Sequence, residues 1–283
     1  MAGPDGAEPD AVSRVLGTRP GKVIAVHLNY PSRAAQRGRT PASASYFLKP
    51  PSSLSGSGTV ERPAGTELLA FEGEIALVIG TPARHVRPED GWAHVGWVTA
   101  SNDLGLQDLR TADRGSNVRS KGGDGYTPLG PELIPAEGLD PAGLRLRTWL
   151  DGELVQDDTS DTLLFGFGHL VADLSRMLTL EVGDVILTGT PAGASVAAPG
   201  QVVEVEVAAV DGAASTGRLR TAVVEGPPLA AWGSPPAVDD GVRADAWGTP
   251  VARPGLDPQV RERLERVAVA TLSVQLRRRG FDD

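Results

Sequence analysis

The sequence predicts an α+β fold that is rich in β-structure, on three observations. The 283-residue chain contains 35 glycines and 23 prolines, which interrupt it densely and leave short segments between turns. Most of these segments are rich in β-branched and aliphatic residues, which favours strands. Apolar residues at helical spacing extend over residues 165–178 but are otherwise rare. Many strands and few helices indicate a β-rich domain that ends near Val224.

The first half of this domain contains four strand segments. Residues 22–27 (KVIAVH) open the ordered part, and residues 45–49 form a second run that two prolines close. Residues 68–79 predict one long strand or two joined strands, and residues 92–101 predict another. None of these apolar runs approaches the roughly 18 residues that a membrane-spanning helix needs. We therefore expect a soluble protein without a membrane partner.

The second half of the domain carries two hairpin signals. Asp-Gly pairs favour tight hairpins because glycine tolerates the positive φ that such turns require. The pairs and their strands are Asp151-Gly152 between residues 144–150 and 154–156, and Asp211-Gly212 after residues 202–210. Residues 108–114 predict a short helix besides the longer one at 165–178.

The two ends of the chain differ from the domain at 22–225. Residues 1–21 are rich in Gly, Pro, Asp and Ala and predict a flexible extension without the features of a secretory signal. Repeated prolines and glycines in residues 226–256 predict a linker. Residues 257–283 predict two helices, the first opened by Asp257-Pro258. Two such helices cannot bury a core alone, so we expect them to begin a further domain.

Composition excludes several classes of function. The chain has 27 Lys+Arg and 36 Asp+Glu, a formal net charge of −9, which argues against nucleic acid or an anionic membrane as a partner. It has no cysteine, which excludes disulfides, thiolate catalysis, zinc fingers and iron–sulfur clusters and fits a cytoplasmic location. The motifs of serine hydrolases, P-loop proteins and zinc proteases are absent from the sequence. The four histidines are scattered, and we interpret each as structural or surface-exposed.

Three acidic residues form a candidate metal site. Glu72 and Glu74 are two residues apart in an apolar strand segment, so their carboxylates project from the same face. Asp103 follows the next predicted strand and offers a third oxygen. Without cysteine or clustered histidine, an all-oxygen set selects a hard ion such as Mg²⁺ or Mn²⁺. On spacing alone, a solvated strand face paired with surface lysines or arginines explains the two glutamates equally well.

Two glycine-containing segments could contact a ligand. Lys121 lies in a glycine-dense stretch and is one of three lysines in the chain. Gly189 and Thr190 follow an apolar strand segment and offer backbone N–H groups and a hydroxyl to an anion. A solvated lysine and a simple tight turn are the alternatives for these two places.

In this order, these pieces resemble the fumarylacetoacetate hydrolase family, and most closely its bacterial decarboxylase/isomerase enzymes of homoprotocatechuate breakdown. The resemblance covers residues 22–224. The matching strings are Leu28-Asn29-Tyr30, Tyr46-Phe47-Leu48-Lys49-Pro50, Glu72-Gly73-Glu74, Ser101-Asn102-Asp103, Lys121-Gly122-Gly123-Asp124-Gly125, Thr159-Ser160-Asp161, and the stretch from Leu178 to Asp184 that leads into Thr188-Gly189-Thr190-Pro191. Each string is unspecific, but seven in one order are specific.

The resemblance implies a mixed β-roll, a homodimer and a Mg²⁺ or Mn²⁺ site. It assigns the metal ligands to Glu72, Glu74 and Asp103, which spacing had also suggested, and the active-site lysine to Lys121. It implies that Tyr30, Gly189 and Thr190 bind the substrate, an unsaturated 2-oxo dicarboxylate of aromatic catabolism. The implied chemistry is stabilisation of an enolate by the cation while an adjacent bond breaks, with Lys121 stabilising the charge or moving a proton.

One departure from the family bears on the reaction. Members that break carbon–carbon bonds commonly carry a histidine and, three residues later, a glutamate where this sequence has Arg33 and Gln36. Arginine cannot act as a base, so isomerisation or decarboxylation is favoured over hydrolysis. His27 lies six residues too early to fill that position. Arg110 stands where relatives often have glutamine, and with Arg33 it would suit a second substrate carboxylate.

Two other functions stay open at this point. One is a carbon–carbon hydrolase of the acylpyruvate or fumarylacetoacetate type that uses another base. The other is a catalytically silent domain that binds a metabolite or serves as a scaffold. Residues 256–280 resemble the opening helices of the RraA-like aldolase/decarboxylase family, which implies that the natural protein is a fusion.

Overall fold

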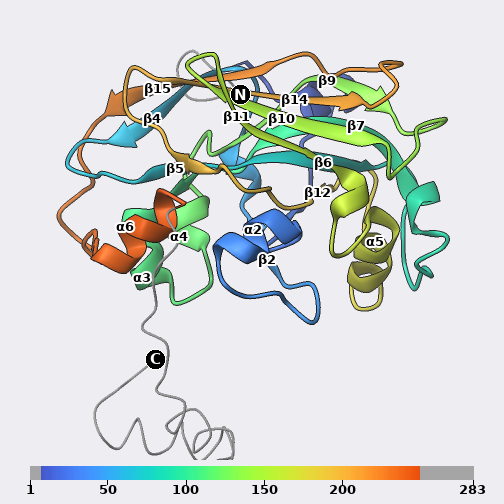
Figure 1. Cartoon of the computed structure of the whole chain (residues 1–283), viewed down its shortest axis with the longest axis horizontal. Coiled ribbons are helices and arrows are strands. Elements are labelled where there is room, and N and C mark those ends of the chain that lie inside the picture. Colours follow the sequence, from blue (N-terminus) through green and yellow to red (C-terminus); the bar gives the residue numbers. More distant parts are fainter. Residues whose placement is uncertain (1–7, 249–283) are drawn as a thin grey trace, which may run out of the picture. The chain divides into compact units, whose positions relative to one another are not determined.

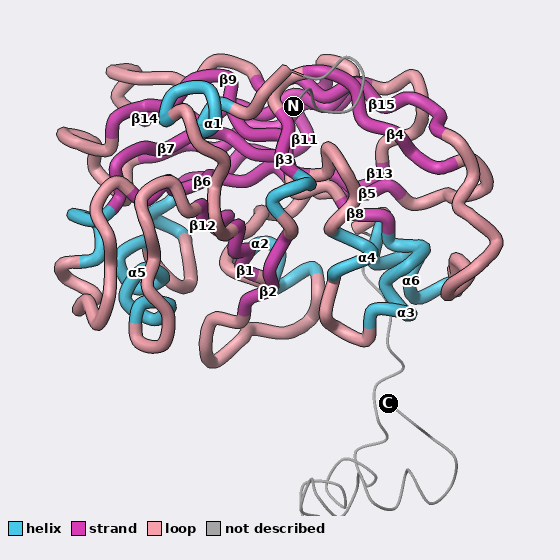
Figure 2. Tube along the Cα trace, turned by 180° about the vertical axis from the view of Figure 1, so that it is seen from behind, coloured by secondary structure: helices cyan, strands magenta, loops and turns pink. Residues whose placement is uncertain are grey.

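The computed structural model describes residues 8–248. The two helices predicted for residues 257–283, and their RraA-like resemblance, lie outside the described residues. Within the described residues, two larger sheets and one small sheet carry short helices on their edges (Figures 1 and 2). The predicted β-rich α+β class is confirmed, and no helix in residues 8–248 is long and apolar enough to cross a membrane.

The largest sheet has seven strands and is mixed. In spatial order they are β2 (Tyr46–Lys49), β1 (Val23–Val26), β12 (Val185–Leu187), β6 (Gly73–Ile79), β7 (Val95–Asn102), β9 (Thr127–Pro135) and β3 (Leu54–Ser55). The pairs β1–β12 and β3–β9 are parallel, and the other pairs are antiparallel. Every residue of β6 is buried, since both faces of this central strand are covered.

A five-stranded sheet packs on the large one. Its order is β11 (Glu153–Thr159), β10 (Leu144–Leu150), β14 (Val202–Ala209), β15 (Leu219–Gly226) and β4 (Gly58–Pro63). Leu146 and Val205 from this sheet share one apolar core with Ile75 and Leu77 of β6. The hairpin predicted at Asp151-Gly152 joins β10 to β11, with φ of 50° and 85° at its two turn residues.

The predicted strand at 68–79 is two strands that belong to different sheets. β5 (Leu69–Phe71) pairs with β13 (Ser195–Val196) and β8 (Gly105–Leu106) in the small sheet, whereas β6 belongs to the seven-stranded sheet. Glu72 lies at the break between them. A Cβ on Gly73 would lie 2.0 Å from Thr148 Oγ1, so only glycine allows β10 to pass this close.

The helices are short. The predicted helix is α5 (Phe167–Ser175), and residues 107–113 form η3 (Gln107–Leu109) and α3 (Arg110–Asp113). Four helices had no sequence signal strong enough to predict them: α1 (Ala11–Leu16), α2 (Pro31–Gln36), α4 (Val118–Lys121) and α6 (Asp240–Ala246). The remaining 3₁₀ turns are η1 (Pro51–Ser53), η2 (Gly91–His94) and η4 (Ser160–Thr162). In both views α2, α3, α4 and α6 lie on the same side of the sheets (Figures 1 and 2).

Two segments differ from the flexible extension and linker that composition predicts. The Asp10 side chain caps α1, and Ala11 and Val12 are fully buried, because this single turn of apolar residues packs along β9. Within the predicted linker, Asp239 caps α6 and Ala246 is buried among other apolar side chains. In both places a helix cap and a few apolar contacts stabilise a short helix, although the glycines and prolines around it favour irregular structure.

Candidate metal centre and active site

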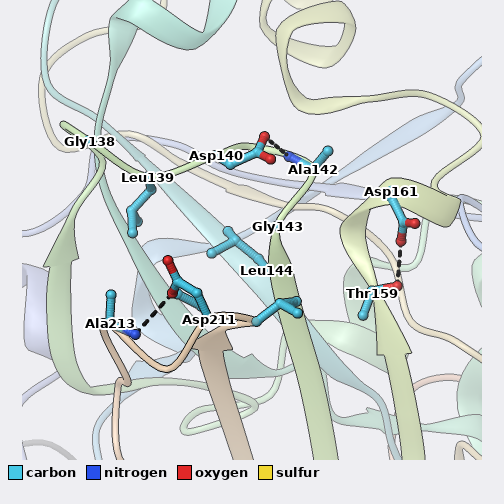
Figure 3. Close-up of a pocket in the computed structure, with 12 residues that line it drawn as sticks. Gly138, Leu139, Asp140, Ala142, Gly143, Leu144, Thr159, Asp161, Asp211 and Ala213 are labelled. Carbon is cyan, nitrogen blue, oxygen red and sulfur yellow. Dashed lines mark hydrogen bonds between the residues drawn. The ribbon is translucent and has the colours of Figure 1, made fainter.

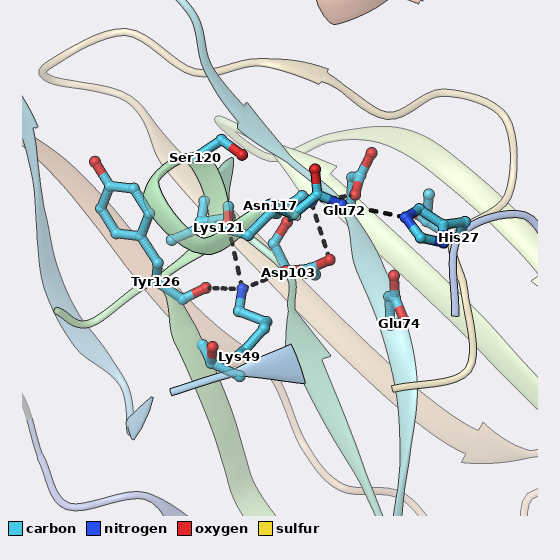
Figure 4. A network of polar contacts seen from close by, with 12 residues as sticks. His27, Lys49, Glu72, Glu74, Asp103, Asn117, Ser120, Lys121 and Tyr126 are labelled. Atoms are coloured by element: carbon cyan, nitrogen blue, oxygen red, sulfur yellow. Dashed lines mark hydrogen bonds and ion pairs between the residues drawn. The ribbon is translucent and has the colours of Figure 1, made fainter. Parts of the chain in front are cut away.

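Three carboxylates converge where the large and small sheets meet. Glu72, Glu74 and Asp103 each offer one oxygen, and these oxygens lie within 4.8 Å of one another (Figure 4). Glu72 occupies the break between β5 and β6, Glu74 lies on β6, and Asp103 follows β7. The backbone fixes this arrangement, since Asp103 N–H donates to the Glu72 carbonyl at 2.8 Å.

Two lysines neutralise part of this charge. Lys121 Nζ donates to Glu72 Oε2 at 2.5 Å and to Asp103 Oδ2 at 2.9 Å. Lys49, whose side chain is fully buried, forms an ion pair with Asp103 and donates to the Tyr126 carbonyl at 2.9 Å. Lys49 belongs to one of the segments that resemble the family, but its sequence context predicts no role for it. Its rarity, one lysine of three, was the available signal.

A glycine allows Lys121 to reach the acids. Lys121 is the last residue of α4, and its aliphatic stem lies against Gly105 of β8. A Cβ on Gly105 would lie 2.9 Å from Lys121 Cδ and Cε, so a larger residue would push the ammonium away.

The charges affect the members of this cluster differently. Burial alone would raise the pKa of Glu72, but Lys121 and Arg33 outweigh it and lower the pKa to about 2. The pKa of Glu74 is well above its usual range, because of burial and of the negative charges of Asp103 and Glu72. Burial favours the neutral amine of Lys121, yet Asp103 and Glu72 raise its pKa to about 12. Burial lowers the pKa of Lys49 despite its contact with Asp103.

The donor set fits a hard divalent cation. Glu74 is 1% exposed and the Glu72 side chain 16%, with the largely buried Lys121 as its partner, so the solvated strand face considered for these two glutamates is wrong. The Glu74 carboxylate accepts one backbone bond, from Gly189 N–H at 2.6 Å, and keeps a raised pKa. A divalent ion among the three oxygens would relieve the repulsion that raises this pKa, and oxygen ligands are those that Mg²⁺ and Mn²⁺ prefer.

Tyr30, Gly189 and Thr190 lie close to this centre. The Thr190 hydroxyl donates to the Gly73 carbonyl and accepts from Gln156 Nε2, both at 2.8 Å, so in this structure it braces β6. Tyr30 is fully buried, and its hydroxyl has no hydrogen-bond partner among the described residues. Burial and the charges of Asp158 and Glu74 raise the Tyr30 pKa, which keeps this hydroxyl a proton donor.

The two predicted arginines lie in different places. Arg33, on α2, is buried and donates to Gln36 Oε1 at 2.8 Å and to Glu72 Oε1 at 3.4 Å. Arg110, at the start of α3, forms an ion pair with Asp245 of α6 at 2.9 Å. The structure therefore brings Arg33 to the carboxylates and pairs Arg110 with a helix that the sequence did not predict.

His27, interpreted from the sequence as structural or surface-exposed, lies beside this site (Figure 4). Its Nε2 is 3.2 Å from Asn117 Nδ2, and its Nδ1 is 3.1 Å from Ser45 Oγ. Asn117 precedes α4, the helix that ends at Lys121. Burial, and then the charge of Lys121, lower the pKa of His27, which favours the neutral imidazole. No motif could have revealed this histidine, because its partners come from residues far along the chain.

A surface cavity lies elsewhere in the molecule. It has a volume of about 440 Å³ and is lined by the turns at the ends of β10, β11 and β14 (Figure 3). Its aspartates serve those turns: Asp140 accepts from Ala142 N–H and Asp211 from Ala213 N–H, both at 2.9 Å. It shares no residue with the three carboxylates, so we place the candidate site at Glu72, Glu74 and Asp103.

Comparison with known proteins identifies the class of this chain. Residues 22–224 match the family model described as "Fumarylacetoacetate (FAA) hydrolase C-terminal". The chain therefore belongs to the fumarylacetoacetate hydrolase family, as the resemblance predicted.

Particular relatives carry more specific names. The Escherichia coli "4-hydroxyphenylacetate degradation bifunctional isomerase/decarboxylase" is 39% identical over 193 residues, which are 67% of this chain and 45% of that protein. The chain thus matches a little under half the length of this relative. The rat "Oxaloacetate tautomerase Fahd2a, mitochondrial" is 33% identical over 179 residues, 62% of this chain and 57% of that protein.

The fold is shared with solved structures. A 5-carboxymethyl-2-hydroxymuconate delta-isomerase from Mycobacterium smegmatis superposes with a TM-score of 0.66 at 34% identity, covering 74% of this chain and 78% of that one. A 2-hydroxyhepta-2,4-diene-1,7-dioate isomerase from Mycobacterium marinum gives 0.63 at 32% identity, covering 73% and 75%. The predicted mixed β-roll is confirmed by these structures.

Proposed function

We propose that this chain is a Mg²⁺- or Mn²⁺-dependent enzyme that isomerises or decarboxylates unsaturated 2-oxo (2-hydroxy-dienoate) dicarboxylates from aromatic catabolism. The observation that carries the proposal is the convergence of Glu72, Glu74 and Asp103 within 4.8 Å beside Lys121, in a chain of this family. The names of the bacterial relatives support the same reaction type. A homodimer, as implied by the family resemblance, and a cytoplasmic location belong to the same proposal.

Each residue of the candidate site has a separate role in the proposed reaction. Glu72, Glu74 and Asp103 would hold the cation, which when bound supplies a Lewis acid for the carboxylate and keto oxygens of a 2-oxo acid. Lys121 stays protonated because of its acidic neighbours, so it is suited to stabilise negative charge on a substrate oxygen rather than to remove a proton. Tyr30 offers a buried hydroxyl without a partner among the described residues, and it can donate to a bound ligand.

Hydrolysis ranks lower in this proposal. Arg33 and Gln36 bond to each other at 2.8 Å, and neither is a base that could activate water. Isomerisation and decarboxylation need a stabilised enolate but no activated water.

The rat relative favours a second candidate, the tautomerisation of oxaloacetate. Keto–enol exchange in a 2-oxo dicarboxylate passes through the same enolate and also needs no activated water. It would use the same three carboxylates and Lys121. Like isomerisation and unlike decarboxylation, it breaks no carbon–carbon bond.

An ultraviolet absorbance assay on the purified chain tests these alternatives. With Mg²⁺, we expect turnover of 5-carboxymethyl-2-hydroxymuconate or a related dienoate, abolished by EDTA and by Glu72→Gln. Faster enol–keto exchange of oxaloacetate than of the dienoates would put the tautomerase first. Water-dependent cleavage of acylpyruvates would put a hydrolase first. If calorimetry detects no Mn²⁺ binding, the favoured hypothesis becomes a catalytically silent domain that binds a metabolite or serves as a scaffold.

A further inference from the structure

Helix α6 lies outside the part of the chain that matches the family and yet adjoins the candidate site. The family match ends at residue 224, whereas α6 covers Asp240–Ala246. The carboxylate of Asp245 forms ion pairs with Arg37 at 2.6 Å and with Arg110 at 2.9 Å. Arg37 is the C-cap residue directly after α2 and Arg110 begins α3, so one carboxylate joins two elements on the side of the sheets where α4 lies.

A short series of contacts connects this ion pair to the carboxylates. Arg33, one turn before Arg37 on α2, donates to Glu72 at 3.4 Å. Gln36 accepts from Arg33 and donates to the Gly248 carbonyl at 2.9 Å, just beyond α6. A small crevice is lined by these residues: Arg33, Gln36, Arg37, Asp245 and Gly248. Arg33 thus contacts Glu72 and lies in the same group of residues as Arg37 and Asp245.

The cluster of Arg37, Arg110 and Asp245 is partly exposed to solvent and carries a net positive charge. The side chains of Arg110 and Asp245 are 42% and 30% exposed, so a ligand from solution can reach them. Two guanidinium groups share one carboxylate, which leaves an excess of one positive charge. Guanidinium groups bind carboxylates through paired hydrogen bonds, so this cluster attracts a further carboxylate.

Helix α6 is held by contacts that do not depend on Asp245. Ala246 packs against Leu68 and Val196, and Arg243 pairs with Glu67 at 3.1 Å. Ala237 N–H donates to the Asp108 carbonyl at 2.8 Å. Replacement of the Asp245 carboxylate at the arginines therefore need not unfold the helix.

We propose that Arg37 and Arg110 form the subsite for the distal carboxylate of the substrate, and that Asp245 occupies this subsite until a dicarboxylate displaces it. The inference rests on the proposed function, since it takes the 2-oxo end of the substrate to lie at Glu72, Glu74 and Asp103. Asp245 then determines specificity: a 2-oxo monocarboxylate leaves it in place, and a dicarboxylate of sufficient length competes with it.

Two probes that differ only in the distal group test this. 2-Oxoadipate has the second carboxylate and 2-oxohexanoate lacks it, and their binding to the full Mg²⁺-loaded chain is measured by calorimetry. We expect Asp245→Asn to bind 2-oxoadipate about fivefold more tightly, the factor that corresponds to one surface ion pair, with 2-oxohexanoate unchanged. Arg110→Gln weakens 2-oxoadipate about tenfold and leaves 2-oxohexanoate unchanged. The matched control is Asp240→Asn, which should alter neither probe. Asp240 is an exposed carboxylate of the same helix, and among residues 8–248 its ion-pair partner is Arg243.

A fluorescence signal follows Asp245 directly. Trp247 is half-exposed two residues after Asp245, so saturation of the unmutated chain with 2-oxoadipate changes its emission, whereas 2-oxohexanoate does not. Trp247→Phe removes this change. The inference is overturned if Asp245→Asn weakens 2-oxoadipate, as a positioning role predicts, or shifts both probes equally. Failure of both probes to bind the unmutated chain with Mg²⁺ overturns the proposed function itself, and the inference with it.

Discussion

The acidic and the basic sides of the candidate site are built in different ways. Glu72, Glu74 and Asp103 sit at strand ends, two of them within three residues, and sheet register fixes them. Arg37 and Arg110 lie at the ends of two short helices and pair with the carboxylate of Asp245, more than a hundred residues away in the chain. The first side is rigid and buried, whereas the second is partly exposed and held by ion pairs. We infer that the buried side supplies the reaction chemistry and the exposed side selects the substrate.

The sharpest test of this division is removal of one charge from the buried side. Glu74→Gln is expected to abolish Mn²⁺ binding, seen by electron paramagnetic resonance, and to lower turnover about a thousandfold, since the cation supplies several kcal/mol of charge stabilisation. The matched control is Glu153→Gln on exposed β11, which should change neither. Full Mn²⁺ affinity in Glu74→Gln would contradict the ligand assignment.

Replacement of the buried Lys49 separates the stability that ion pairing gives to Asp103 from the stability that metal binding gives. Lys49→Met leaves Asp103 without its fully buried partner, so we expect the free energy of unfolding of the metal-free protein to fall by about 3–5 kcal/mol. Saturating Mn²⁺ should recover part of this loss, because the cation compensates the same carboxylate. Urea denaturation with and without Mn²⁺ measures both values. Arg145→Met removes an exposed pair with Asp157 and should cost no more than about 1 kcal/mol.

The requirement for glycine at the break between β5 and β6 is tested by adding one carbon, a Cβ, at Gly73. Gly73→Ala places a Cβ at 2.0 Å from Thr148 Oγ1 and should destabilise the domain by about 1–3 kcal/mol. Thr148→Ala in the same chain removes that oxygen and should restore part of the stability. Equal thermal midpoints for Gly73→Ala and the unmutated protein would show that β10 moves aside at little cost.

The smallest effect is a pH dependence on the exposed side. Burial opposes ionisation of Asp245, but Arg37 and Arg110 outweigh it and lower its pKa below the usual value of about 3.9. A depressed carboxyl pKa stabilises the folded state fully above the ordinary value, and this contribution is lost as the pH falls through the folded pKa. Trp247 emission should therefore be constant above about pH 4 and change only below it. Asp245→Asn should remove this change, whereas a transition near pH 6 would implicate another group.

The sequence predicted more of the buried side than of the exposed side. Spacing and strand alternation made Glu72, Glu74 and Asp103 candidates, the family resemblance selected them, and the structure places their oxygens within 4.8 Å. The sequence did not predict that Arg110 pairs with Asp245, because α2 and α6 are too short to give a periodic signal and α6 was therefore not expected. The sequence predicts no site role for Lys49 or His27, because their partners, Asp103 and Asn117, are far away in the chain.

The amino-acid sequence alone determined the β-rich class, the family and the acidic residues of the candidate site. These depend on local pattern: alternation along strands, glycine at turns, and motifs in a fixed order. Only the tertiary structure decided which cations neutralise those acids and which carboxylate lies between Arg37 and Arg110. Ion pairs form between whichever side chains the packing of sheets and helices brings within about 4 Å, and a linear sequence does not specify that distance.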